Sequence, residues 1–205
     1  MSEAAPIRFH LDFVSTYSYF ASQGIDAVAA HHGRRVDWIV VSLPHVFRAA
    51  GTTSPLEQPL KLAHNRQDTQ RCAAMLGLPF APPATRPNLR LARLLFHRLK
   101  AREADAAARF ARSAMALRFG TGREIDSAEA LAGVAADLGI DRADVDAAAC
   151  DPVASRALRE ATDAAVADGM FGAPFARIGD ARFWGHDRVL DHLDWWLARE
   201  KETTT

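Results

Sequence analysis

The sequence has very little cysteine. Its 205 residues include only Cys72 and Cys150, which lie far apart and form no Cys-x-x-Cys pattern. A disulfide scaffold, a cysteine-based zinc site and a dithiol redox centre therefore lack the residues that they need. The eight histidines form no His-Glu-x-x-His pattern, so we expect no metal site.

An excess of one charge and long apolar runs are also lacking. Lys and Arg together number 25, and so do Asp and Glu, which argues against a protein that coats nucleic acid. No apolar run approaches the roughly 20 residues of a membrane helix. Residues 1–9 lack the basic and apolar regions of a secretory signal. We expect a cytoplasmic protein with neither a nucleic-acid nor a membrane partner.

The N-terminal quarter has the pattern of a β-α-β unit. Residues 7–14 alternate apolar with polar side chains for most of their length, which predicts a strand. Residues 19–32 predict a helix that Gly33 ends, and residues 36–42 predict a nearly buried strand. Two strands joined in this way are expected to be parallel.

The middle of the chain, from about residue 45 to 168, is rich in alanine and predicts helices. Breaks are expected at residues 51–55, 77–87, 120–122 and 151–152. Asp151 followed by Pro152 is typical of a helix start.

Charge is unevenly distributed within this helical block. Residues 61–118 hold 12 Lys and Arg against three Asp and Glu, whereas residues 124–168 hold three against 11. We interpret these as solvated helix faces that attract each other across a bundle. The alternative is a positive potential over a cleft that binds carboxylates, supplied by Lys61, Arg66, Arg90 or Arg93.

Strand patterns return only near the C-terminus. Residues 174–178 and 181–184 flank Gly179-Asp180, which predicts a hairpin. We expect Asp187 to cap a final helix, and we expect core or interface packing for Trp184, Trp195 and Trp196. The order of elements predicts an α/β fold, a thioredoxin-like domain with an inserted all-helical domain. Residues 1–45 and 169–205 would form the first domain, and residues 46–168 the second.

Two short segments could carry chemistry. Ser15-Thr-Tyr-Ser18 lies where the first strand ends and the first helix begins, and a helix N-terminus favours anions and lowers the pKa of a nearby thiol. A redox thioredoxin has Cys-x-x-Cys there, so the serines exclude dithiol exchange and leave a hydroxyl suited to a ligand's thiolate. The simpler alternative is that Ser15 only caps the helix. Pro174 precedes a strand, where either a cis bond or an ordinary trans turn is possible.

These segments carry a family resemblance. Leu-Asp-Phe-Val-Ser-Thr-Tyr-Ser-Tyr-Phe-Ala, residues 11–21, is similar to the signature of 2-hydroxychromene-2-carboxylate isomerases and kappa-class glutathione transferases. Both belong to the DsbA-like branch of the thioredoxin fold. Residues 168–175 and 183–188 resemble the second signature of that family, and residues 46–51 and 59–61 also match.

The resemblance implies glutathione as the cofactor. Ser15 matches the catalytic serine that holds the glutathione thiolate. The other matches imply glutathione contacts. The backbone of Ala173, before a cis Pro174, would pair with the cysteinyl backbone, and Asp187 would receive the γ-glutamyl ammonium. The helix start at Asp187, with His186, would face the γ-glutamyl carboxylate, and Lys61 and Thr52 would contact the tripeptide.

Three positions depart from the family pattern, and two further residues are candidate substrate contacts. Thr16 replaces a proline, Thr52 an asparagine, and His186 a smaller polar residue, so the substrate is less well defined than the cofactor. Asn88 resembles a position near the substrate pocket, although a helix cap explains it equally well. Tyr17 is the second candidate substrate contact.

The resemblance thus implies an enzyme. The expected activity is a glutathione-dependent isomerase that acts on a small aromatic carboxylate of the 2-hydroxychromene-2-carboxylate type, and relatives suggest a homodimer. One alternative is a kappa-type glutathione transferase or peroxidase. Another is a non-catalytic thioredoxin-fold binding protein that keeps the cleft only for packing.

Overall fold

The computed structural model describes residues 5–82 and 88–203. The chain begins with strand β1 (Ile7–Leu11), helix α1 (Thr16–His31) and strand β2 (Val36–Val40). β1 and β2 are parallel, as the sequence predicts. The first strand is shorter than predicted, because Asp12 begins a turn in which its carbonyl accepts a hydrogen bond from the Ser15 amide (2.9 Å).

In its described part, the central segment contains helices and loops but no strand, as expected. It comprises α2 (Leu43–Ala49), η1 (Pro55–Glu57), α3 (Pro59–Leu76), α4 (Arg90–Lys100), α5 (Ala104–Met115), η2 (Ala116–Gly120), α6 (Ala128–Ala136), α7 (Arg142–Ala148) and α8 (Pro152–Ala167). The predicted start of α8 is confirmed, since the Asp151 carboxylate accepts hydrogen bonds from the amides of Val153 (2.8 Å) and Ala154 (3.1 Å). Part of the predicted break at 77–87 lies outside the described residues.

The C-terminal segment completes the sheet. It consists of β3 (Phe175–Ile178), β4 (Ala181–Trp184), η3 (Arg188–His192) and α9 (Leu193–Thr203). The strand order is β2-β1-β3-β4, and β3 is antiparallel to both of its neighbours, which confirms the predicted hairpin. The prediction that Asp187 caps the last helix is wrong. Helical structure already begins at His186, and the Asp187 side chain makes no capping bond.

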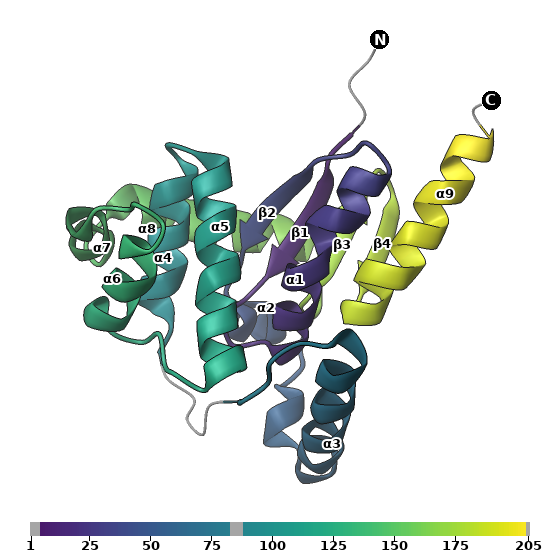
Figure 1. Cartoon of the computed structure of the whole chain (residues 1–205), viewed down its shortest axis with the longest axis horizontal. Coiled ribbons are helices and arrows are strands. Elements are labelled where there is room, and N and C mark those ends of the chain that lie inside the picture. Colours follow the sequence, from purple (N-terminus) through teal and green to yellow (C-terminus); the bar gives the residue numbers. More distant parts are fainter. Residues whose placement is uncertain (1–4, 83–87, 204–205) are drawn as a thin grey trace.

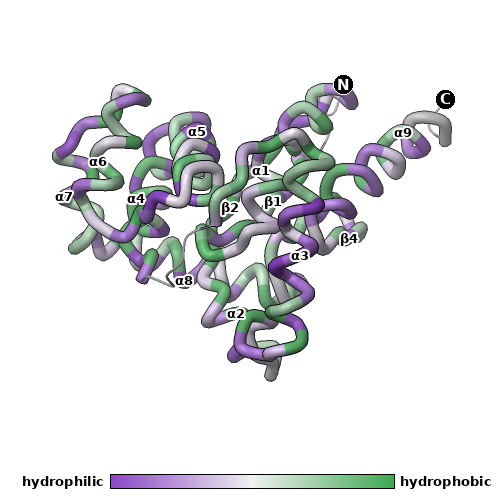
Figure 2. The backbone as a smooth tube through the Cα atoms, turned by 60° about the horizontal axis from the view of Figure 1, so that its bottom comes forward, coloured by the Kyte–Doolittle hydropathy of each residue, from purple (hydrophilic) through white to green (hydrophobic). Residues whose placement is uncertain are grey.

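Helices cover both faces of the sheet (Figure 1). α1 packs against the η3–α9 segment on one face, where Phe9 and Trp38 belong to the main core. On the other face, Ile39 and Phe175 pack with Ala165 at the end of α8. Figure 2 shows hydrophilic stretches on outlying helices such as α3 and α7.

The main core continues from the sheet into the helical segment. Phe13, which follows β1, meets Phe110 of α5 with ring centroids 6.1 Å apart, and Phe96 of α4 belongs to the same buried cluster. The two predicted domains, 1–45 with 169–205 and 46–168, thus share one core, and their division at these residues stays a prediction. Within the described ranges, no helix combines the length and apolar character needed to cross a membrane.

The uneven charges of the helical block pair with each other, as interpreted from the sequence. Arg98 of α4 binds Asp144 (3.0 Å) and Asp151 (2.8 Å), and Arg102 also binds Asp144 (2.7 Å). Basic and acidic stretches therefore hold α4, α7 and the start of α8 together.

Arg93 is not available to a cleft, so the alternative of a positive potential is wrong for this residue. It is buried and donates to both carboxylate oxygens of Asp12, at 2.9 and 3.0 Å. Asp12 also accepts the Leu43 amide at 2.7 Å. This buried ion pair ties the end of β1 to α4 and to the start of α2.

Candidate active site

The site is built around the first residue before α1. Ser15 has extended backbone angles, and its Oγ accepts a hydrogen bond from the Ser18 amide at 3.1 Å. The same hydroxyl donates to the carbonyl oxygen of Ala173 at 3.0 Å. Ser15 therefore does cap the helix, and it also links the helix start to a segment 158 residues away in the sequence.

That distant segment contains a cis peptide bond between Ala173 and Pro174, as the family resemblance implies. The Pro174 carbonyl accepts a hydrogen bond from the Gly185 amide at 3.1 Å. Gly185 has φ = +102°, a conformation that L side chains rarely adopt. This turn lets β4 lead directly into the helix that carries His186 and Asp187.

An aromatic pair lies beside this loop. Trp184 and Phe171 have ring centroids 4.7 Å apart, and both are about half exposed. A Cβ on Gly172 would lie 2.6 Å from the indole nitrogen of Trp184, so only glycine allows this approach. Trp184 and Trp195, which is 58% exposed, do not pack in the core, so for these two residues only the interface part of the prediction remains, and it stays a prediction. In contrast, Trp196 is partly buried and packs on the core.

Tyr17 and His186 bring the two helix starts together. Their rings stack, with centroids 5.3 Å apart and planes 16° from parallel. The Tyr17 hydroxyl donates to Asp68 of α3 at 2.6 Å. Burial and then the Asp68 hydrogen bond raise the pKa of Tyr17, so it remains a neutral donor. Burial lowers the pKa of His186, which favours an uncharged imidazole at neutral pH.

Asp187 presents an ionised carboxylate. Burial alone would raise its pKa, but hydrogen bonding to Arg188 and the charge of that guanidinium outweigh burial and lower the pKa. Arg188 and Asp187 form an ion pair, and the Asp187 side chain remains 40% exposed. An exposed carboxylate of this kind could receive a ligand's ammonium group.

The remaining predicted site residues make no described contact with Ser15 or Asp187. Lys61, in the first turn of α3, is exposed, and so is Thr52, whose amide donates to the Phe47 carbonyl at 2.9 Å. Asn88 is also exposed, and its Oδ1 accepts the Arg90 amide at 3.0 Å. Its interpretation as the N-cap of this helix is wrong by one residue, because Leu89 is the N-cap of α4. Among the described hydrogen bonds and ion pairs, none links these three side chains to Ser15 or Asp187.

Two residues of α3 were missed by the sequence interpretation. Asp68 binds Tyr17, and the Cys72 thiol lies 3.7 Å from the Asp68 carboxylate. Burial and the nearby Asp68 raise the pKa of Cys72 to about 11, so this thiol stays protonated and unreactive. The sequence spacing could have indicated them, because Lys61, Asp68 and Cys72 are separated by seven and four residues and therefore lie on one face of a helix.

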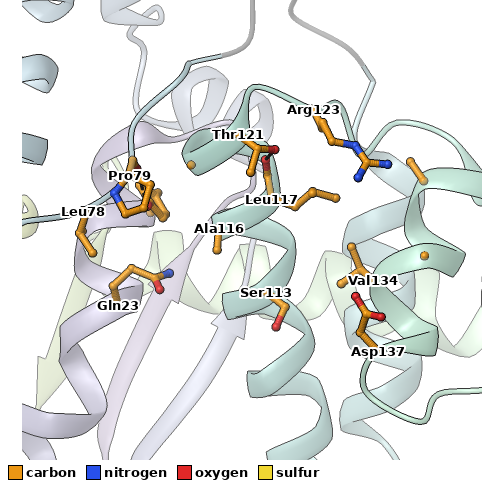
Figure 3. A pocket seen from close by; sticks show the side chains of 14 residues that line it. Gln23, Leu78, Pro79, Ser113, Ala116, Leu117, Thr121, Arg123, Val134 and Asp137 are labelled. Carbon is orange, nitrogen blue, oxygen red and sulfur yellow. Dashed lines mark hydrogen bonds between the residues drawn. The ribbon is translucent and has the colours of Figure 1, made fainter.

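A separate cavity of about 710 Å³ lies where α1, residues 78–79, η2 and α6 meet (Figure 3). Tyr19, Gln23 and Leu117 line it, with Arg123 and Asp137 at the α6 side. None of the predicted site residues lines this cavity. The candidate active site is thus distinct from it.

Comparison with known proteins identifies the family of this chain. Residues 6–194 match the family of the DSBA-like thioredoxin domain. The chain belongs to the DsbA-like thioredoxin family. A 2-hydroxychromene-2-carboxylate isomerase from Pseudomonas putida is 31% identical to this DsbA-like protein over 186 residues, which cover 90% of each chain. Glutathione s-transferase kappa 2 from Caenorhabditis elegans is 28% identical over 198 residues, covering 90% of this chain and 84% of the relative.

Solved structures show the same DsbA-like fold. A 2-hydroxychromene-2-carboxylate isomerase superposes with a TM-score of 0.83 at 27% identity, covering 97% of this chain and 98% of the other. The cytosolic disulfide reductase DsbM from Pseudomonas aeruginosa, solved with GSH, has a TM-score of 0.69 at 17% identity. It covers 97% of this chain and 98% of its own, and this likeness concerns the fold alone.

Proposed function

We propose that this protein is a glutathione-dependent isomerase that converts 2-hydroxychromene-2-carboxylate, or a related aromatic catabolite, to the trans-o-hydroxybenzylidenepyruvate type of product. The observation that carries the proposal is the Ser15 hydroxyl, held at the N-terminus of α1 and 3.0 Å from the carbonyl that precedes cis Pro174. This is the position where a redox thioredoxin carries its reactive sulfur. A serine there suits a reaction in which the sulfur arrives with a ligand.

The residues present fit glutathione by their chemistry. This tripeptide has one ammonium, two carboxylates and one thiol. Asp187 offers an exposed anion to the ammonium, Lys61 an exposed cation to a carboxylate, and Ser15 a hydroxyl beside helix amides to the sulfur. When bound, glutathione supplies a sulfur nucleophile that adds to a conjugated carbon and leaves again, so that none is consumed.

Ser15 acts in this proposal as a hydrogen-bond donor and not as the nucleophile. In the described part of the chain its hydroxyl contacts only the Ser18 amide and the Ala173 carbonyl, so no base is present to activate it. A ligand amide that donates to the Ala173 carbonyl would compete with the Ser15 hydroxyl for this oxygen. The hydroxyl hydrogen could then turn to the thiolate, while the Ser18 amide still holds Oγ in place.

Further parts of the proposal concern surroundings and assembly. A neutral His186 stacked on Tyr17 forms one side of the site, and Thr52, Asn88 and Tyr17 remain proposed contacts. We propose that the protein is a cytoplasmic homodimer and that its substrate is a small aromatic carboxylate.

Turnover with a count of free thiol tests the reaction. The purified protein should convert 2-hydroxychromene-2-carboxylate only when glutathione is present, with a saturable dependence on its concentration. The free thiol concentration should stay constant while substrate disappears. An activity that persists without glutathione contradicts the proposal.

Glutathione transferase activity is the second candidate function, because the chain is similar to the kappa-type relative from Caenorhabditis elegans. Loss of one thiol for each product molecule would favour that activity. A protein that neither binds glutathione in calorimetry nor turns over substrate would instead be a non-catalytic binding protein.

A further inference from the structure

Three side chains that commonly bind metals meet where the C-terminal end of α1 lies next to α9. Figure 1 shows these two helices on the same side of the sheet. They are His31, His32 and Asp194. We propose that these residues form a binding site for a divalent transition metal ion such as Zn²⁺. The proposed site does not depend on the isomerase activity.

The geometry brings together ligand atoms from two helices. One nitrogen of each imidazole and one oxygen of Asp194 all lie within 4.8 Å of one another. Ligand atoms around a tetrahedral Zn²⁺ ion lie about 3.3 Å apart, given metal–ligand distances of about 2.0 Å. Small rotations of an exposed side chain would close the remaining gap, and His31 is exposed.

The backbone explains how two consecutive histidines face the same point. Neighbouring residues inside a helix point in different directions. α1, however, ends at His31, and His32 is the C-cap, with φ = −100° and ψ = 7°. The two rings therefore meet, with centroids 4.8 Å apart and planes at 89°.

His32 is the buried member of the cluster, and Asp194 holds one of its ring nitrogens. Its side chain is only 3% exposed, and its Nε2 lies 2.8 Å from Asp194 Oδ1. Its Nδ1 is also buried but has no hydrogen-bond partner among the described residues. The imidazole is thus only partly used by the protein, and a buried polar atom without a partner is uncommon.

The donor set determines the class of ion. Imidazole nitrogen favours Zn²⁺, Ni²⁺, Cu²⁺ and Co²⁺ over Mg²⁺ and Ca²⁺, which prefer oxygen ligands. Three protein ligands leave a fourth position for water. The C-terminal end of α1 also carries the partial negative charge of the helix dipole, which favours a cation.

A bound ion would fasten α9 to the end of α1. A polar link already lies close by, since Arg34 binds Glu200 of α9 at 2.5 Å. A second link is the contact between His32 and Asp194. An ion at the His31–His32–Asp194 site would replace this contact by metal–ligand bonds that include His31, and it would stabilise the native state through mass action.

Calorimetric titration of the untagged full chain with Zn²⁺ tests the proposal. We expect saturable binding of one ion, with at least a tenfold loss of affinity in His31→Ala. His31 is exposed, so this variant should fold normally. Asp194→Asn should weaken binding as well, whereas Mg²⁺ should not bind.

Two control variants identify adventitious binding. His45→Ala removes another surface histidine that pairs with an aspartate, Asp163 at 3.1 Å, and should leave Zn²⁺ affinity unchanged. Cys150→Ser removes the exposed thiol and should do the same.

Co²⁺ provides a spectroscopic readout. Its visible absorption should show tetrahedral coordination in the wild type and lose this signal in His31→Ala. The proposal is overturned if Zn²⁺ does not bind saturably, or if His31→Ala and Asp194→Asn bind it as tightly as the wild type.

Discussion

Replacing Ser15 by alanine separates the role of a thiolate donor from that of a helix cap. The change removes the acceptor for the Ser18 amide and the donor to Ala173. Loss of the cap should cost about 1 kcal/mol of unfolding free energy. Loss of the second hydrogen bond should add about 1 kcal/mol. In the glutathione complex, where the hydroxyl hydrogen turns from Ala173 to the thiolate, the change instead removes a charge-assisted bond of roughly 1.5–3 kcal/mol.

The last loss has a distinct signature. Loss of this bond should raise the pKa of the thiol of bound glutathione by about one to two units, because one unit corresponds to about 1.4 kcal/mol. The thiolate fraction near neutral pH should then fall about ten- to a hundredfold, and activity should fall with it. Activity should partly recover at alkaline pH, where the thiol ionises without help.

The assay is the ultraviolet absorbance of the thiolate against pH, measured on glutathione complexes. Ser127→Ala is a matched control, because the Ser127 hydroxyl caps α6 by accepting the Ala130 amide at 3.2 Å, and none of the candidate site residues lies on that helix. This control should lose about 1 kcal/mol of stability and leave the thiol pKa unchanged. Ser15→Thr keeps a hydroxyl and should retain a low thiol pKa. Superimposable titrations of wild type and Ser15→Ala would remove Ser15 from the mechanism.

Three further predictions follow from individual contacts. Asp187→Asn should weaken glutathione binding about tenfold in calorimetry, since loss of a charged partner costs about 1.5 kcal/mol. Arg93→Leu should lower the urea-derived unfolding free energy by about 3–5 kcal/mol, because it leaves the Asp12 carboxylate buried without its cation. Burial lowers the pKa of His97 to about 4, below the unfolded value of 6.5, so the unfolded chain binds more protons between these values. Stability should therefore fall as pH decreases from about 6.5 toward 4, by up to about 1.4 kcal/mol per unit, and less steeply in His97→Gln.

Specific outcomes would contradict these expectations. Equal glutathione affinity in Asp187→Asn would mean that Arg188 alone engages this carboxylate. A wild-type stability in Arg93→Leu would show that the buried pair is dispensable. An equal pH slope in His97→Gln and in a control at the exposed His64 would exclude His97 as a source of that slope.

Much of the fold follows from local sequence signals. Gly77 ends α3 with φ = +63°, Asp151 begins α8, and Gly179 forms the hairpin turn with φ = +54°. Each signal acts within a few residues, so it can be interpreted without knowledge of distant segments. The serine pair and Pro174 marked the candidate site for the same reason.

The contacts that shape the site could not be predicted from local sequence signals. Tyr17 and Asp68 lie 51 residues apart, and Asp12 and Arg93 lie 81 apart, so no local periodicity connects them. The assignment of Asp187 as a cap failed because the positive φ of Gly185 lets the helix begin at His186, so that Asp187 lies inside its first turn. Sequence alone showed an acidic residue near a helix start but could not fix the turn before it.

The Asp12–Arg93 pair limits which segments can be exchanged between relatives. Asp12 belongs to the strand end that precedes Ser15, whereas Arg93 belongs to the helical segment. A chimera that takes its helices from a relative with an uncharged residue at position 93 would leave Asp12 without a cation next to the site. The two segments must therefore be exchanged together. If only the helices are exchanged, Asp12→Asn is the first substitution to add, because it removes the unpaired buried charge.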